Sequence, residues 1–94
     1  MTAYVIVGAT PINPEKQKAY AADVPATLKM YGGALVAVGP VEQLHGEFDY
    51  LSQVILKFAS KEDAKTWYNS PEYQALIPNR DEGMNAQFQL IEYV

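Results

Sequence analysis

The pattern of apolar and polar residues along the chain predicts four β-strands. They are expected over about residues 3–9, 34–38, 51–59 and 86–93, with a further extended piece over 41–44. In the third strand Val54, Leu56 and Phe58 alternate with a mixed set of residues, so one of its faces is apolar. The first strand is apolar or small on both faces, and we therefore expect it to be covered on both sides.

A long helix is expected between the first two strands. Asn13 and Pro14 predict its start, because Asn caps free amides and Pro has no amide to leave unpaired. Its apolar stripe recurs every three or four residues, at Tyr20, Val24, Leu28 and Tyr31. The helix is expected over residues 14–31, with a kink or a break at Pro25, and it ends at the two glycines that follow.

A second helical region follows the third strand. Ser60 and Asp63 form the capping pattern of a helix start. The buried stripe of this helix, and of a short helix after it, is expected at Ala64, Trp67, Tyr68, Tyr73, Leu76 and Ile77. Pro78 is expected to end the short helix, before a polar turn over 79–83.

The order βαββαβ predicts an α+β fold, the ferredoxin-like sandwich, in which both helical segments cover one face of an antiparallel sheet. The other face would then expose Ile55 and Ile91 to water, and an open apolar face of this kind usually marks an interface. We therefore expect a homodimer in which two such faces pair into a barrel. The same face carries polar residues that predict a partly wet cavity between the sheets: Gln53, Lys57, Gln87 and Gln89.

Length and composition narrow the possible functions. A chain of 94 residues fits a single domain over 1–94. It has no Cys, which excludes disulfides, thiolate metal sites and thiol catalysis. The net charge of -4 and the lack of a basic cluster argue against nucleic-acid binding, because phosphate recognition needs a basic patch. We recognise no targeting sequence or membrane segment, so a cytoplasmic location is expected.

Arg80, the only arginine, is the first candidate for ligand binding. It follows the predicted short helix, and a guanidinium beside a cavity can hold a carboxylate through two parallel hydrogen bonds. The alternative is a surface ion pair with Asp81, Glu82 or Glu72.

Three tyrosines are further candidates. Tyr68 and Tyr73 can form an aromatic wall for a planar ligand, and Tyr31 can direct its hydroxyl toward a cavity. The alternative for the first two is a place in the core, as the spacing also indicates for Trp67. From the mixed face of the third strand, Gln53 and Lys57 are candidates for ligand contacts.

His45 is the only histidine and therefore the one side chain of a type that transfers protons near neutral pH. With Asp49 nearby, it is the candidate for catalysis. The alternative is that both are ordinary polar residues of a loop between strands. One His, no Cys and scattered carboxylates argue against a metal site. No glycine-rich nucleotide motif occurs, so no cofactor is expected.

Four stretches of the chain carry a family resemblance: Tyr31-Gly32-Gly33, Gly46-Glu47-Phe48, Ser60 to Gln74, and Arg80. By these stretches the chain resembles the uncharacterised bacterial family known as domain of unknown function 1330. The resemblance implies a dimeric α+β barrel and brings no established activity. The wider barrel group includes cofactor-free monooxygenases, haem-degrading enzymes, muconolactone isomerases and stress-responsive proteins. Related sequences often have Trp, Pro and Arg before the third strand, whereas this chain has Phe48 and neither Pro nor Arg there.

We therefore expect a homodimer whose cavity, between the helices or between the sheets, binds a small organic molecule such as a carboxylate. Any catalysis is expected to be cofactor-free, of the monooxygenase or isomerase kind. The alternative is a non-enzymatic interaction or scaffold protein, in which the dimer itself is the function. Nucleic-acid binding is a third and less favoured interpretation.

Overall fold

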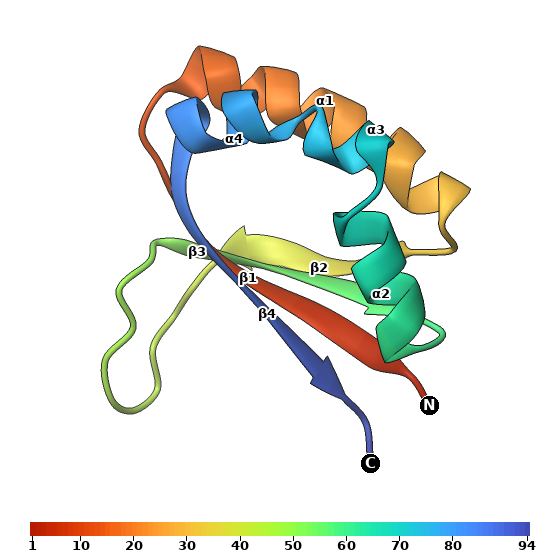
Figure 1. Cartoon of the computed structure of the whole chain (residues 1–94). Coiled ribbons are helices and arrows are strands. Elements are labelled where there is room, and N and C mark those ends of the chain that lie inside the picture. Colours follow the sequence, from red (N-terminus) through yellow and green to blue (C-terminus); the bar gives the residue numbers. More distant parts are fainter.

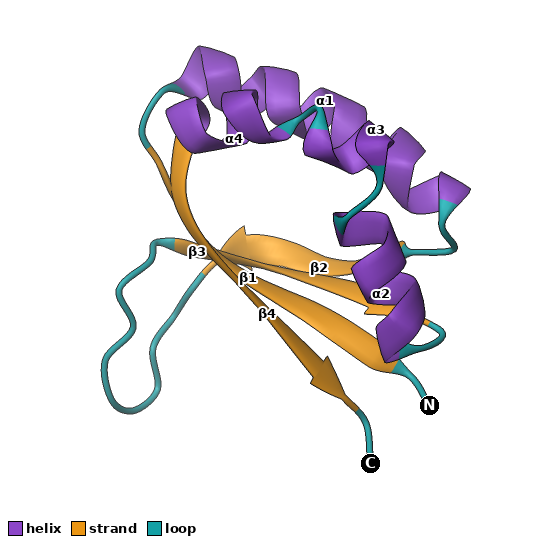
Figure 2. Cartoon of the chain, in the orientation of Figure 1, coloured by secondary structure: helices purple, strands orange, loops and turns teal.

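Helices cover one face of a four-stranded antiparallel sheet, and Figures 1 and 2 show the other face without helices. The computed structural model describes all 94 residues. The strands are β1 (Ala3–Pro11), β2 (Ala34–Pro40), β3 (Ser52–Phe58) and β4 (Met84–Glu92). The helices are α1 (Pro14–Met30), α2 (Lys61–Tyr68), α3 (Pro71–Gln74) and α4 (Ile77–Gly83).

The strand order β2-β3-β1-β4 is that of the ferredoxin-like fold, so the predicted α+β sandwich is confirmed. β1 lies inside the sheet, where Val5 is opposite Leu56 of β3 and Leu90 of β4. β2 is an edge strand that pairs only with β3, and its register shifts between Leu35 and Ala37. No helix combines the length and hydrophobicity that a membrane crossing requires.

α1 begins where its capping signals predict. The Asn13 side chain accepts hydrogen bonds from the N–H groups of Glu15 and Lys16, and Pro14 occupies the first turn. The helix continues through Pro25, so the break that the sequence allowed does not occur. Because Pro25 has no N–H, the carbonyl of Ala21 lacks its usual helical donor.

Three local predictions are wrong. Pro78 does not end a helix but lies in the first turn of α4, where its missing N–H costs nothing. Residues 79–83 are therefore helical and not a turn. Residues 41–44 form no strand and belong to the loop between β2 and β3, which Val41 closes by donating to the Leu51 carbonyl.

The centre of the core is aromatic. Trp67, Tyr73 and Phe58 are its largest fully buried side chains, each at most 1% exposed. The Trp67 ring centroid lies 4.3 Å from that of Tyr73 and 5.4 Å from that of Phe58. Its Nε1–H donates to the Thr27 hydroxyl at 3.0 Å, which ties α2 to α1. The core position that the sequence indicated for Trp67 is confirmed.

α1 lies closer to α4 and α3 than to any strand. Gly83 permits this approach, because a Cβ there would stand 2.5 Å from the backbone nitrogen of Gln17. The Gly83 carbonyl also accepts from the N–H groups of Ile12 and Asn13 at the start of α1. α1 is thus held by its neighbouring helices and stands away from the sheet, as Figure 1 shows.

Candidate functional site

A cavity of about 500 Å³ lies between α1 and the helix-facing side of the sheet. Its walls are mostly apolar and include Val24, Leu28, Leu35, Val38, Val54 and Leu56. Small residues, among them Ala21 and Ala34, also line it and leave space that a larger side chain would fill. The volume lies within the range of about 300–1,000 Å³ that is typical of small-molecule pockets.

The edge strand β2 forms the outer wall of this cavity. Leu35 and Val38 line it, opposite Leu56 and Val54 of β3. The register shift between the two β2 residues brings side chains three positions apart onto the same face. They are 56% and 64% exposed, so the cavity is open to solvent along this edge.

The cavity wall includes the segment of α1 in which the helical hydrogen bonding is interrupted. Ala21 and Pro25 both line the cavity. The Ala21 carbonyl has lost its helical donor to the proline ring, so the gap in the hydrogen bonding of α1 coincides with the cavity.

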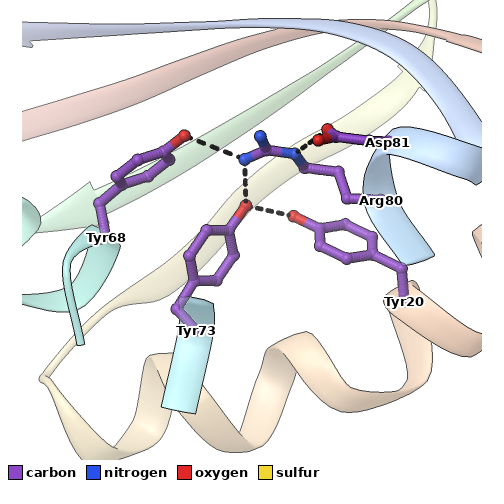
Figure 3. Close-up of polar contacts among 5 residues, drawn as sticks. All are labelled: Tyr20, Tyr68, Tyr73, Arg80 and Asp81. Atoms are coloured by element: carbon purple, nitrogen blue, oxygen red, sulfur yellow. Dashed lines mark hydrogen bonds and ion pairs between the residues drawn. The ribbon is translucent and has the colours of Figure 1, made fainter. Parts of the chain in front are cut away.

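A polar cluster lies beside the cavity and joins side chains from four helices (Figure 3). We call it the Arg80 cluster; its members are Tyr20, Tyr68, Tyr73, Arg80 and Asp81. Arg80 Nη1 donates to the hydroxyls of Tyr68 at 3.0 Å and Tyr73 at 3.2 Å. Arg80 Nε donates to Asp81 at 3.1 Å. The hydroxyls of Tyr73 and Tyr20 are hydrogen-bonded at 2.8 Å.

Tyr20 and Phe88 connect the Arg80 cluster to the cavity. Both line the cavity. Arg80 Cζ lies 4.9 Å from the centroid of the Phe88 ring, close enough for a cation–π interaction. The cluster and the cavity therefore share an aromatic wall.

The protonation states in the Arg80 cluster follow from burial and hydrogen bonding. Burial raises the pKa of Tyr20, and the neighbouring Tyr73 raises it further. Burial also raises the pKa of Tyr73, although its hydrogen bonds with Tyr20 and Arg80 partly offset this. Burial lowers the pKa of Arg80, but its hydrogen bonds with Tyr68 and Tyr73 outweigh that effect and raise it. At neutral pH these phenols are neutral and the guanidinium is charged, so none of them is a base.

Three of the predicted ligand-binding residues come together in the cluster: Tyr68, Tyr73 and Arg80. Arg80 forms an ion pair with Asp81, as the alternative to a ligand-binding role predicted. Its side chain is nevertheless only 13% exposed and also donates hydrogen bonds to Tyr68 and Tyr73. Tyr73 is fully buried, which agrees with the alternative prediction that it packs in the core. Tyr68 is half-buried at the edge of the cluster.

Tyr31 lies outside the cavity and the cluster. Its hydroxyl donates to Glu72 Oε1 at 2.6 Å and so links the end of α1 to α3. This hydrogen bond raises the pKa of Tyr31 and lowers that of Glu72.

The other four predicted residues lie away from Arg80. His45 and Asp49 are in the exposed loop between β2 and β3. At His45 the backbone carbonyl accepts a hydrogen bond, from the Gln43 side chain. Gln53 and Lys57 alternate with Val54 and Leu56 of the cavity wall, so they point to the helix-free face of the sheet. No three His, Cys, Asp or Glu side chains come together to hold a metal ion.

Tyr20 and Phe88 are members of the site that the sequence did not single out: Tyr20 was placed only on the apolar stripe of the first helix, and Phe88 lies within the strand predicted over 86–93. Their periodicity shows that they point inward, but it carries no information about what they meet there. Tyr20 is 53 residues from Tyr73 in the chain, and no local sequence pattern predicts their hydrogen bond.

Comparison with known proteins identifies a family without a known activity. Residues 2–94 match the family described as "Domain of unknown function (DUF1330)". No curated protein matches the chain in sequence.

Solved structures share the fold at low sequence identity. The RPA0582 protein of unknown function from Rhodopseudomonas palustris is 15% identical, with a TM-score of 0.79 over 99% of this chain and 82% of that one. A dimeric ferredoxin-like protein of unknown function from Jannaschia sp. CCS1 is 12% identical, with a TM-score of 0.75 over 99% and 100%. SnoaB from Streptomyces nogalater, a cofactor-independent oxygenase, is 11% identical, with a TM-score of 0.72 over 99% and 93%.

Proposed function

Since the chain belongs to the DUF1330 family, whose function is unknown, we propose from its own geometry that it is a homodimer that binds a small, largely apolar organic molecule. The observation that carries the proposal is the cavity of about 500 Å³ between α1 and the sheet. An apolar cleft of this volume with a few polar groups beside it is the usual form of a small-molecule site. A space of this size in a chain of 94 residues is therefore best explained as a ligand site.

The helix-free face of the sheet supports the dimer. Ile6, Ile55 and Ile91 alternate with residues of the core, and they share that uncovered face with the polar side chains described above. Ile91 is 54% exposed. A second copy, placed face to face with the first, would cover these side chains, and the similar structure from Jannaschia is described as dimeric.

The proposal is one of binding and does not include turnover. Tyr20, Tyr73 and Arg80 keep their protons at neutral pH because their pKa values are raised, so none of them can act as a general base. The likeness to a cofactor-independent oxygenase, at 11% identity, is a likeness of fold.

Calorimetric titration with 2-naphthamide, an uncharged bicyclic aromatic, tests the cavity as the binding site. Ala21 lines the cavity and is exposed at its mouth, so Ala21→Trp fills the space and is expected to weaken binding at least tenfold. Ala19 is exposed on the same helix but does not line the cavity, so Ala19→Trp is the matched control and should bind as the wild type does. Equal losses in both variants, or no binding by the wild type, would overturn the proposal.

Sedimentation velocity tests the dimer. The wild type should sediment as a dimer at micromolar concentration, and Ile55→Glu should sediment as a folded monomer because it places a charge in the apolar interface. Lys65→Glu, on the exposed side of α2, is the control and should remain dimeric. A monomeric wild type would refute the dimer. A dimer that binds no probe would favour the scaffold alternative.

A further inference from the structure

We propose that Arg80 and Tyr68 form a carboxylate-binding subsite beside the cavity, so that the ligand is an organic acid with its apolar part in the cavity. This inference rests on the proposed function and names the chemical class of its ligand. It follows from hydrogen-bond donors that have no acceptor within the protein.

The guanidinium of Arg80 uses only part of its donor capacity. Nε donates to Asp81, and Nη1 donates to the hydroxyls of Tyr68 and Tyr73. Nη2 makes no hydrogen bond within the protein, and in Figure 3 no dashed line reaches it from the four other residues drawn. Every buried side-chain nitrogen and oxygen of the chain has a hydrogen-bond partner. Nη2 is therefore not completely buried, which the proposed contact with a ligand requires.

The hydroxyl of Tyr68 is the second free donor. Its oxygen accepts from Arg80 Nη1 at 3.0 Å, which leaves its own O–H to donate. No side chain or carbonyl accepts from it. Two donor groups from α2 and α4 thus lie next to each other without an acceptor. A carboxylate, which has two oxygens and accepts hydrogen bonds only, matches this arrangement.

The charge of Arg80 is also incompletely balanced. Its one ion-pair partner within 4 Å is Asp81, whose side chain is 65% exposed, and an exposed carboxylate gains little from such a pair. The Arg80 side chain is 13% exposed, and rings of Tyr68 and Phe88 lie within 6 Å of its Cζ. Burying a guanidinium in this way carries a desolvation cost, and an anionic ligand with low exposure to water would offset it.

Phe88 connects this subsite to the cavity. Its side chain lines the cavity, and its ring centroid lies 5.7 Å from that of Tyr68 and 4.9 Å from Arg80 Cζ. The free donors are therefore separated from the cavity by one aromatic side chain. A molecule with its apolar part in the cavity reaches them with an acid group that passes the edge of Phe88.

The test compares 2-naphthoate with 2-naphthamide, two probes of similar shape of which only the first is an anion. The full-length wild type is expected to bind 2-naphthoate about tenfold more tightly, the effect of hydrogen bonds to a charged group. Tyr68→Phe, which removes only the hydroxyl and keeps the charge of Arg80, should lose part of this preference. Tyr31→Phe removes a tyrosine hydroxyl outside the cluster and should keep the full preference.

The possible results separate this inference from the proposed function. Equal binding of the two probes by the wild type overturns the carboxylate subsite and leaves the cavity proposal intact. Equal loss of preference in Tyr68→Phe and Tyr31→Phe also overturns it. Binding of neither probe overturns the proposed function and the inference together. Circular dichroism of each variant establishes that a loss comes from the binding site and not from unfolding.

Discussion

The space between the helices and the sheet is filled in two different ways. Under α2 and α3, Trp67, Tyr73 and Phe58 pack against one another with almost no exposure. Under α1, toward β2, the same layer contains a cavity of about 500 Å³. We call these the aromatic half and the hollow half. Both belong to one sheet and one helix layer, so the difference comes from side-chain size and from the attachment of α1 to α4.

This difference teaches that the fold does not depend equally on its two halves. Large aromatic side chains bury the most apolar area and contribute most to stability. The hollow half contributes less, and its wall strand β2 is exposed. In such a protein the aromatic half can stabilise the fold while the packing of the hollow half changes locally.

The largest expected effect comes from removing a buried aromatic side chain from the aromatic half. Trp67→Ala should lower the free energy of unfolding by about 3–5 kcal/mol, because it removes a fully buried ring from between two others. Urea denaturation followed by circular dichroism measures this. Val38→Ala, on the exposed wall of the hollow half, is the control and should cost less than about 1 kcal/mol. Similar losses in the two variants would refute the division.

The next effect concerns the hydrogen bond that joins the aromatic half to α1. Thr27→Val keeps the side-chain shape but leaves the buried Trp67 Nε1–H without an acceptor, at a cost of about 1–3 kcal/mol. Urea denaturation should show Thr27→Ser close to the wild type, since serine retains the hydroxyl. If Thr27→Ser loses as much as Thr27→Val, the methyl group of Thr27 and not the hydrogen bond is what matters.

A stabilising change is expected on the hollow side of α1. Pro25→Ala restores the donor for the Ala21 carbonyl and should raise the free energy of unfolding by about 1–2 kcal/mol. Alanine is favoured over proline inside a helix. Part of this gain is lost because alanine gives the unfolded chain more conformational freedom than proline does. Thermal unfolding measures the gain. Pro78→Ala, in the first turn of α4, should change stability little. A loss of stability in Pro25→Ala would show that the proline ring supports the cavity.

The smallest effect is a dependence of stability on alkaline pH. Burial raises the pKa of Tyr20 above its ordinary value of 10.0, so near pH 10 the unfolded chain releases a proton that the folded chain keeps. The unfolded state then binds fewer protons, and the stabilisation that is complete below pH 10 is lost as pH rises. By pH 10.5 the loss from Tyr20 is about 1 kcal/mol. In urea titrations between pH 8 and 10.5, Tyr20→Phe should show a correspondingly smaller decline. Identical declines would mean that Tyr20 ionises freely in the folded protein.

Local signals explain how much of this molecule could be predicted from its sequence. Asn13 and Ser60 start helices because a capping side chain acts within three residues, and both were recognised. Pro78 was misread because proline is found both after the end of a helix and within the first turn of the next. The identity of the residue alone does not distinguish these positions.

The site was predictable only in part, because it is made by contacts between distant segments. Arg80, Tyr68 and Tyr73 were recognised by residue type and by their place near one helical region. The cavity depends on how closely α1 approaches α4, which Gly83 decides by its contact with Gln17. A cavity is space that side chains leave unfilled, and hydrophobic periodicity records only which side chains point inward.

The position of β2 at the edge of the sheet has a consequence for the molecules that can enter the cavity. β2 is hydrogen-bonded to β3 alone, so its outward displacement breaks a single ladder and leaves β1, β3 and β4 paired. The open edge of the cavity can therefore widen by a local fluctuation with a free energy below that of global unfolding. Under the proposed function, this widening would admit molecules larger than the static opening allows, while the aromatic half stays folded.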